Sequence, residues 1–221
     1  DNSSYVIASS DGKTLYSIAD EGVVSFRILP NGSLARLNSS SIRGMRGCHL
    51  CTDEEDKYVF VSGYHDGKTT VLNLNPDGSV GKIVDGVFDR GYGSVAERNF
   101  RPHVTCTRRM PDNRFVLSVD NGIDQVKIYR FNDKEQKLVQ VDAIRCDLES
   151  APRHFRYSKD GKFIYLMYEL KKAIEVYTYK TGDRAPVIEK IQTISTTSTK
   201  NPDNLTAACA MRMSIDQKYI Y

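Results

Sequence analysis

The sequence lacks tryptophan, long apolar runs and blocks of like charge. No apolar run approaches the ~20 residues that a membrane-spanning helix needs. The net charge is only +3 and the charges alternate in sign along the chain, which argues against a protein dedicated to nucleic acids or membrane surfaces. A hydrophobic content of 40% with 27% charged residues is ordinary for a globular chain, so wholesale disorder is excluded.

Cysteine is also scarce, with five residues at positions 48, 51, 106, 146 and 209. This odd, scattered set does not fit a secreted disulfide framework. Cys48 and Cys51 have the spacing of a zinc half-site, but no second CxxC or HxxxH motif completes four ligands. On a strand the two thiols would point to opposite faces. We therefore expect reduced cysteines, no metal, no cofactor and a cytoplasmic protein.

The organising feature of the sequence is an internal repeat. A turn-plus-strand phrase recurs five times, with its acidic turn residue at positions 11, 55, 112, 160 and 216, a step of about 51 residues. A second β-branched and aromatic phrase follows in the first four units, centred on Phe26, Leu72, Tyr129 and Tyr177. It lies 15 residues after the acidic residue in the first unit and 17 in the next three.

Each unit is interpreted as four short antiparallel strands, because helical periodicity is almost absent and turns bound each run. In the fourth unit the strands are predicted at about 153–158, 162–169, 173–179 and 188–194. Both faces of 162–169 are apolar, as expected for a sheet between two neighbours. The pattern predicts an all-β fold, a β-propeller with four-stranded antiparallel blades. A two-sheet sandwich would not keep the 17-residue offset. The tryptophan-aspartate repeat class has a shorter period of ~40–45 residues.

Polar residues gather where the first strand of a unit begins and its second strand ends. His49, His103 and Arg153-His154 begin first strands, while Glu169 ends a second strand and His65 lies near the end of another. Antiparallel pairing places these positions on one rim, beside the axial channel. Imidazole, guanidinium and carboxylate groups there suit anion binding and proton transfer. The alternative is that they hydrogen-bond the blades to one another. The sequence has no G-x-S-x-G elbow, P-loop or dinucleotide fingerprint.

Several motifs carry a resemblance to a known family. They are Gly47-Cys48-His49-Leu50, Glu97-Arg98 with Pro102-His103, Ala151-Pro152-Arg153-His154 and Tyr168-Glu169-Leu170. The chain resembles, over essentially its whole length, the seven-bladed propeller lactonases, which include bacterial 6-phosphogluconolactonase and fungal carboxy-muconate cyclase. Arg153 and Glu169, sixteen residues apart, belong to the most specific of these motifs.

The resemblance implies hydrolysis of 6-phosphogluconolactone in the pentose phosphate pathway, without a metal. It implies a small anionic lactone as partner, and neither nucleic acid nor membrane. His103, Arg153 and Glu169 match the catalytic positions, and His49, Arg98 and His154 surround them as substrate-binding candidates. In this hypothesis His103 activates water, an arginine stabilises the charge on the lactone carbonyl and another holds the phosphate. Glu169 orients Arg153 or shuttles a proton.

The chain departs from the family pattern at three places. Thr105 stands where a second histidine is common, Ala210 stands where a carboxylate is common, and a further arginine would lie beyond Tyr221. Two alternatives therefore stay open. One is an enzyme that acts on another lactone or cyclises a dicarboxylic acid, and the other is a non-catalytic propeller that binds a metabolite or a protein.

The length of the chain bears on the number of blades. Seven blades of this period need about 360 residues, so 221 residues are expected to hold four to five blades of one propeller domain, 1–221, incomplete at both ends. No oligomeric state is predicted.

Overall fold

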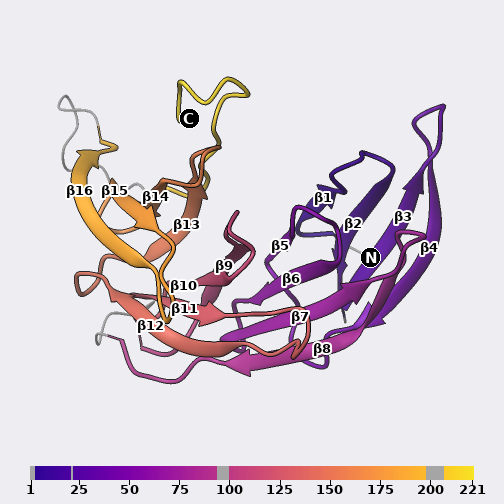
Figure 1. Cartoon of the computed structure of the whole chain (residues 1–221), viewed down its shortest axis with the longest axis horizontal. Helices are drawn as coiled ribbons and strands as arrows, with labels where there is room; N and C mark the ends of the chain where they lie inside the picture. Colours follow the sequence, from indigo (N-terminus) through magenta and orange to yellow (C-terminus); the bar gives the residue numbers. More distant parts are fainter. Residues whose placement is uncertain (1–2, 21, 94–99, 198–206) are drawn as a thin grey trace.

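The computed structural model describes residues 3–20, 22–93, 100–197 and 207–221. Within these residues every regular element is a strand, and the sixteen strands form four antiparallel sheets of four. Figure 1 shows the sheets following one another along an arc. This confirms the predicted all-β, propeller-type architecture. No helix capable of crossing a membrane occurs in the described ranges.

We call the sheets blades 1 to 4. Blade 1 comprises β1 (Val6–Ala8), β2 (Thr14–Ala19), β3 (Gly22–Ile28) and β4 (Leu34–Ser41). Blade 2 comprises β5 (His49–Thr52), β6 (Tyr58–Gly63), β7 (Lys68–Leu74) and β8 (Val80–Phe88). Blade 3 comprises β9 (Val104–Arg109), β10 (Phe115–Asp120), β11 (Gln125–Arg130) and β12 (Val139–Arg145). Blade 4 comprises β13 (Pro152–Tyr157), β14 (Phe163–Tyr168), β15 (Ala173–Lys180) and β16 (Val187–Ser195). The four strands predicted for the fourth unit match blade 4 to within one residue at every end.

The repeated turn has the same backbone geometry in all five copies. Its first residue donates its N–H to the carbonyl five residues later, from Ser9 to Thr14 in the first copy and from Ser214 to Tyr219 in the last. The fourth residue of each turn has a positive φ, between 50° and 69°, at Gly12, Asp56, Asn113, Gly161 and Gln217. The five copies of the turn thus share one hydrogen bond and one backbone conformation.

The acidic residue of the turn has a structural role. Asp11, Asp160 and Asp216 each accept the backbone N–H of the residue two positions later. In the second copy Glu55 occupies the predicted position, but the carboxylate that accepts the turn N–H groups is that of Asp53. The Glu55 side chain pairs with Lys57 instead. Asp53 thus stands where the first, fourth and fifth copies have a serine, at Ser9, Ser158 and Ser214.

Three hydrophobic layers join neighbouring blades. Blades 1 and 2 enclose a layer that contains Tyr16 and Leu50. Blades 2 and 3 enclose Phe60 and Phe131. Blades 3 and 4 enclose a third layer, made largely of Phe115, Leu117, Val119, Phe155, Ile164, Leu166 and Tyr168. Burial of these side chains is what holds successive sheets face to face.

The first strands of the blades meet along the inner side of the arc. β5 contacts β1 on one side and β9 on the other, and β9 also contacts β13. The fourth strands β4, β12 and β16 are the most exposed. The first strands therefore lie innermost, as the propeller prediction requires, and bring their starting residues toward one rim.

Candidate active site

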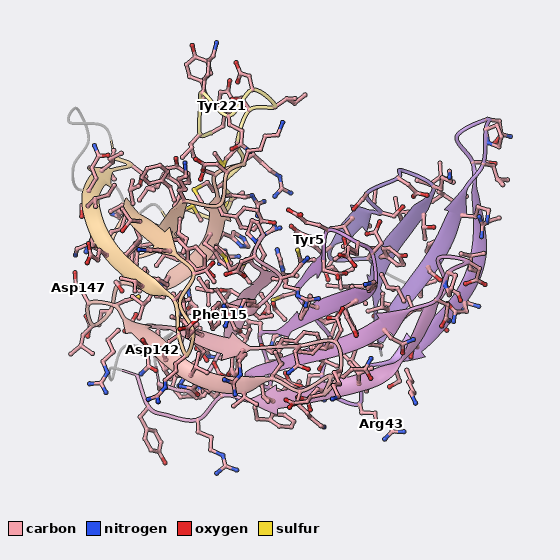
Figure 2. All side chains as sticks on the ribbon, in the orientation of Figure 1. Tyr5, Arg43, Phe115, Asp142, Asp147 and Tyr221 are labelled. Atoms are coloured by element: carbon pink, nitrogen blue, oxygen red, sulfur yellow. The ribbon has the colours of Figure 1, made fainter. Side chains whose placement is uncertain are left out.

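A cavity of about 480 Å³ opens where the inner strands of several blades converge. Tyr5, which lies on the concave side of the arc in Figure 2, forms part of its wall. The other lining residues are Ser4, Cys48, Tyr64, His65, Thr105, Arg153, His154, Glu169 and the segment 209–212. Four of the predicted rim residues therefore line the same cavity: His65 of blade 2 and Arg153, His154 and Glu169 of blade 4.

Arg153 and Glu169 form the charged centre of this cavity. Arg153 Nη1 donates to Glu169 Oε2 at 2.5 Å, and Asn121 Nδ2 donates to the same oxygen at 3.4 Å. The Glu169 side chain is only 8% exposed, whereas that of Arg153 is 32% exposed. A buried carboxylate thus holds a guanidinium group that still reaches the cavity. The structure brings together two of the three residues predicted to be catalytic.

His103, the third of these residues, lies one layer behind the cavity wall. Its ring stacks on Tyr64 with centroids 4.3 Å apart, and its Nδ1 lies 2.7 Å from the carbonyl oxygen of Tyr64. A carbonyl oxygen only accepts, so Nδ1 carries the proton and Nε2 keeps the lone pair. Burial lowers the pKa of His103. The imidazole is therefore neutral near pH 7, in the tautomer that a base requires.

His154 and His49 are also neutral, for related reasons. Burial, reinforced by the guanidinium groups of Arg153, Arg108 and Arg212, lowers the pKa of His154 to about 4. Burial lowers the pKa of His49 even more clearly, again with Arg108 nearby. His154 lines the cavity, whereas His49 is completely buried behind the ring of Tyr5, 4.8 Å away. Of the two histidines, only His154 is placed to touch a ligand directly.

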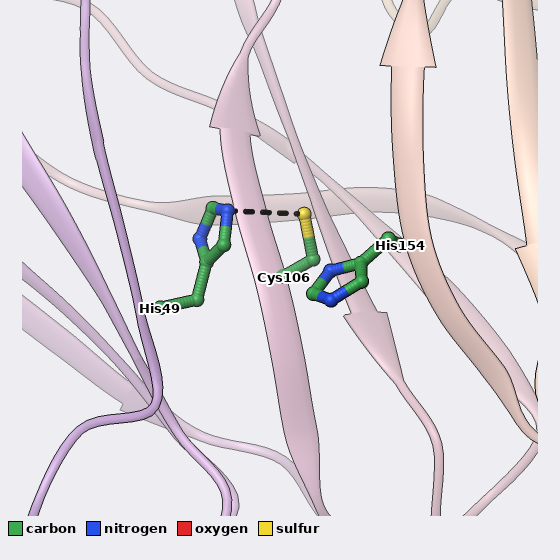
Figure 3. Close-up of side chains that lie close together, drawn as sticks. All are labelled: His49, Cys106 and His154. Carbon is green, nitrogen blue, oxygen red and sulfur yellow. Dashed lines mark hydrogen bonds between the residues drawn. The ribbon is translucent and has the colours of Figure 1, made fainter. Parts of the chain in front are cut away.

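His49, Cys106 and His154 form a cluster that could in principle hold a metal (Figure 3). One candidate ligand atom from each lies within 4.8 Å of the others, and His49 Nε2 is 3.6 Å from Cys106 Sγ. This donor set suits zinc. However, Arg108 Nη2 already lies 3.2 Å from His49 Nε2, and burial raises the pKa of the Cys106 thiol. A guanidinium group against the ligand nitrogen opposes a second cation there.

The paired cysteines of the sequence do not converge. Cys48 Sγ faces the carbonyl oxygen of Val104 at 3.3 Å, and Cys51 Sγ accepts a hydrogen bond from Arg108 at 3.3 Å. Burial raises the pKa of both thiols, that of Cys48 to about 12. The two side chains thus have separate surroundings, as expected for opposite faces of an extended segment.

Two of the departures from the family pattern fall on the cavity wall. Thr105 donates its hydroxyl to the carbonyl oxygen of Arg153 at 2.7 Å, so it anchors the strand that presents the guanidinium group. Ala210 also lines the cavity. Arg98, predicted to bind substrate, lies outside the described residues.

The sequence did not identify several residues of the site. Tyr5 and Tyr64 cover His49 and His103, and Arg108 and Arg212 add positive charge beside His154. Arg108 lies four residues before a turn acid, in the strand that begins beside His103. A search for charged residues along the inner strands, rather than only at their first positions, would have found it.

Comparison with known proteins agrees with this architecture. The chain matches the family described as "Lactonase, 7-bladed beta-propeller" over residues 1–221, and it belongs to that family. It is 29% identical over 225 residues to the 6-phosphogluconolactonase of Bacillus subtilis, with 100% of this chain and 63% of the relative covered. It is 28% identical over 214 residues to an uncharacterised protein of Staphylococcus saprophyticus, with 94% of this chain and 60% of the relative covered.

A solved structure gives the same result. A Bacteroides fragilis protein provisionally named 6-phosphogluconolactonase superposes with a TM-score of 0.85 at 29% identity. The alignment covers 99% of this chain and 62% of that protein. The chain thus spans about three fifths of the length of the relatives that it matches.

Proposed function

We propose that the protein hydrolyses a sugar lactone, with 6-phosphogluconolactone as the first candidate substrate. The observation that carries this proposal is the Arg153–Glu169 ion pair in the wall of the cavity, beside the neutral imidazole of His154. The name of the Bacillus subtilis relative supports the choice of substrate. Five free cysteines support a cytoplasmic setting.

The geometry supports a division of roles. His103 Nε2 takes a proton from water as the water attacks the lactone carbonyl carbon. The Arg153 guanidinium stabilises the oxyanion that forms, and Glu169 holds that guanidinium in place. The intermediate then collapses with cleavage of the carbon–ring-oxygen bond, and the ring oxygen takes the proton back from His103. The product is the open-chain acid. This route requires Tyr64 to admit the water to the ring that it covers.

The electrostatics favour an anionic substrate. Arg212 lines the cavity, and with Arg153 and Arg108 it lies close enough to lower the pKa of His154. Glu169 is the one carboxylate among the cavity-lining residues that the structure describes, and it is engaged with Arg153. The excess of positive charge suits a phosphate, and Arg98 remains a second candidate for holding it.

The test is release of acid from 6-phosphogluconolactone by the full-length protein, measured by pH-stat above the spontaneous rate. We expect Arg153→Ala to lower kcat by about 10²–10³, the usual cost of one oxyanion donor. His103→Ala and Glu169→Gln should also lower kcat. Arg145→Ala, which removes an exposed arginine of β12, is the matched control. Unchanged kcat in the Arg153 and His103 variants would refute the assignment.

The alternatives are separated by the same experiment. A panel of other lactones distinguishes the substrates. A muconate-type dicarboxylic acid in the same panel tests whether the enzyme is a cyclase. A non-catalytic propeller would bind such anions without turning them over. Thr105, which stands where a second histidine is common in the family, supports this alternative, and its hydroxyl donates to the carbonyl oxygen of Arg153.

A further inference from the structure

Asp120, the last residue of β10, organises the backbone around His103. Its Oδ1 accepts the N–H of His103 at 2.8 Å, that of Gly122 at 2.9 Å and that of Ile123 at 3.3 Å. The N–H of Asn121 in turn donates to the carbonyl oxygen of His103 at 2.9 Å. One buried carboxyl group therefore holds both the turn after β10 and the backbone of His103, which directly precedes β9.

The same turn reaches the other half of the candidate site. Asn121, the residue after Asp120, donates its side-chain amide to Glu169 Oε2, the oxygen that also accepts from Arg153. A shift of this turn would therefore move His103 through its backbone and Glu169 through Asn121. Asp120 itself is completely buried and is not among the cavity-lining residues.

A second buried acid faces Asp120. Asp89, which follows β8, accepts the hydroxyl of Tyr129 on Oδ1 at 2.8 Å. Its carboxyl group lies close enough to that of Asp120 for each to change the pKa of the other. Neither Oδ2 receives an N–H or O–H from any other described group. Two ionised carboxylates cannot bond to each other, and their repulsion is strong where water is excluded.

We propose that Asp120 is a positioning residue for the candidate active site and that Asp89 and Asp120 share a single proton. The pair then carries one negative charge, and the proton bridges the two inner oxygens. The shared proton is a property of the pair rather than of either residue. The positioning role rests on the proposed function, whereas the shared proton does not.

The surroundings of the pair support this assignment. Burial and the charge of Asp89 raise the pKa of Asp120 to about 8, and burial also raises that of Asp89. The titratable and charged neighbours are Tyr129 and Lys127 of β11 and the neutral His103. Among the described residues, the cation that lowers the pKa of Asp89 is Lys127. A single ammonium group favours one negative charge on the pair over two.

The sign of the resulting pH dependence follows from linkage. The folded pair keeps a proton that the unfolded chain, with ordinary aspartates near pKa 3.8, has already released. Stability contributed by this proton therefore falls as pH rises from about 4, and the fall levels off above about 8. Asparagine at position 120 reproduces the protonated acid, because its oxygen accepts the backbone N–H groups while its amide donates to Asp89.

The experiment compares urea-unfolding midpoints of the full-length protein from pH 5 to pH 9 for wild type, Asp120→Asn, Asp89→Asn and the control Asp142→Asn. Asp142 is an exposed residue of β12, in blade 3 together with Asp120. We expect the wild-type midpoint to fall relative to both pair variants between pH 5 and 8 and then to run parallel to them. The control should follow wild type throughout. Parallel curves for wild type and both pair variants over the whole range would overturn the shared proton.

Kinetics test the positioning role separately. Asp120→Asn should keep kcat within about threefold of wild type at pH 7, since it preserves the hydrogen bonds. Asp120→Ala, which removes three acceptor contacts, should lower kcat more than it changes KM. A folded Asp120→Ala variant with wild-type kcat would overturn the role. If wild type shows no lactonase activity, the proposed function fails while the unfolding curves still decide the shared proton.

Discussion

At the residue scale, the candidate site combines neutral imidazoles, in and behind the cavity wall, with permanent cations. Burial and the neighbouring guanidinium groups keep His154 and His49 unprotonated. Protonating either ring would add a buried positive charge beside Arg108. The site therefore has unprotonated imidazoles at neutral pH, of which His154 lines the cavity, while its positive charge comes from arginines that do not titrate.

This arrangement predicts a loss of stability in acid. The folded pKa of His154 is about 4, below the ordinary 6.5, so the unfolded chain binds more protons between these values. The free energy of unfolding should then fall as pH decreases below about 6.5. Urea unfolding at pH 7, 6, 5 and 4.5 should show a shallower fall for His154→Gln than for wild type. The prediction fails if the two proteins lose stability in parallel.

The sequence identified some of these residues and missed others for a physical reason. Arg153 and Glu169 could be placed on one rim because each sits at a fixed position of a repeated unit, and the structure pairs them at 2.5 Å. Asp89 and Asp120 could not be paired from the sequence. Asp89 lies outside the turn motif, and its contact with blade 3 depends on how two sheets pack.

At the scale of the elements, stability depends on the layers between blades. Phe60 of β6 is completely buried and packs against Phe131 at 5.8 Å between ring centroids. Beside this layer, Ser62, Thr69, Thr107 and Ser118 form a buried hydroxyl cluster. Hydrophobic contact supplies the driving force, and the paired hydroxyls avoid unsatisfied polar groups.

Removing an aromatic ring from this layer should be costly. Phe60→Ala is expected to lower the free energy of unfolding by about 3–5 kcal/mol, because it leaves a cavity between blades 2 and 3. Phe88→Ala is the matched control. Phe88 is 57% exposed and contacts the Lys68 ammonium group, so its loss should cost about 1 kcal/mol or less. Urea denaturation measures both, and similar losses in the two variants would contradict the assigned layer.

The strands themselves were the most predictable part of the fold. Each unit repeats the same turn, and a positive φ at its fourth residue fixes the hairpin between the first two strands. Apolar runs between such turns then leave little freedom in register. The second unit departs from the pattern, because Asp53 accepts the turn N–H groups that the acidic residue equivalent to Glu55 accepts in the other copies. A side chain two residues away can reach the same N–H groups, and spacing alone does not distinguish them.

At the scale of the whole molecule, blades 2 and 3 are the most extensively packed part of the arc. Each packs against a neighbour on both faces, and every residue of β6 and of β10 is buried. Most residues of β16 are exposed, and β4 has no fully buried residue. Local opening requires less free energy where few apolar contacts are lost. The contrast between inner and outer strands should therefore appear as a gradient of local stability.

Hydrogen exchange followed by mass spectrometry measures this gradient. We expect peptides from β6 and β10 to exchange more slowly than peptides from β4 and β16, in this chain and in any longer protein that contains it. Phe60→Ala should accelerate exchange in both β6 and β10, because the two strands border one shared layer. Phe88→Ala should leave them unchanged. Acceleration confined to β6 would mean that blades 2 and 3 open independently, and the layer between them would not couple the blades.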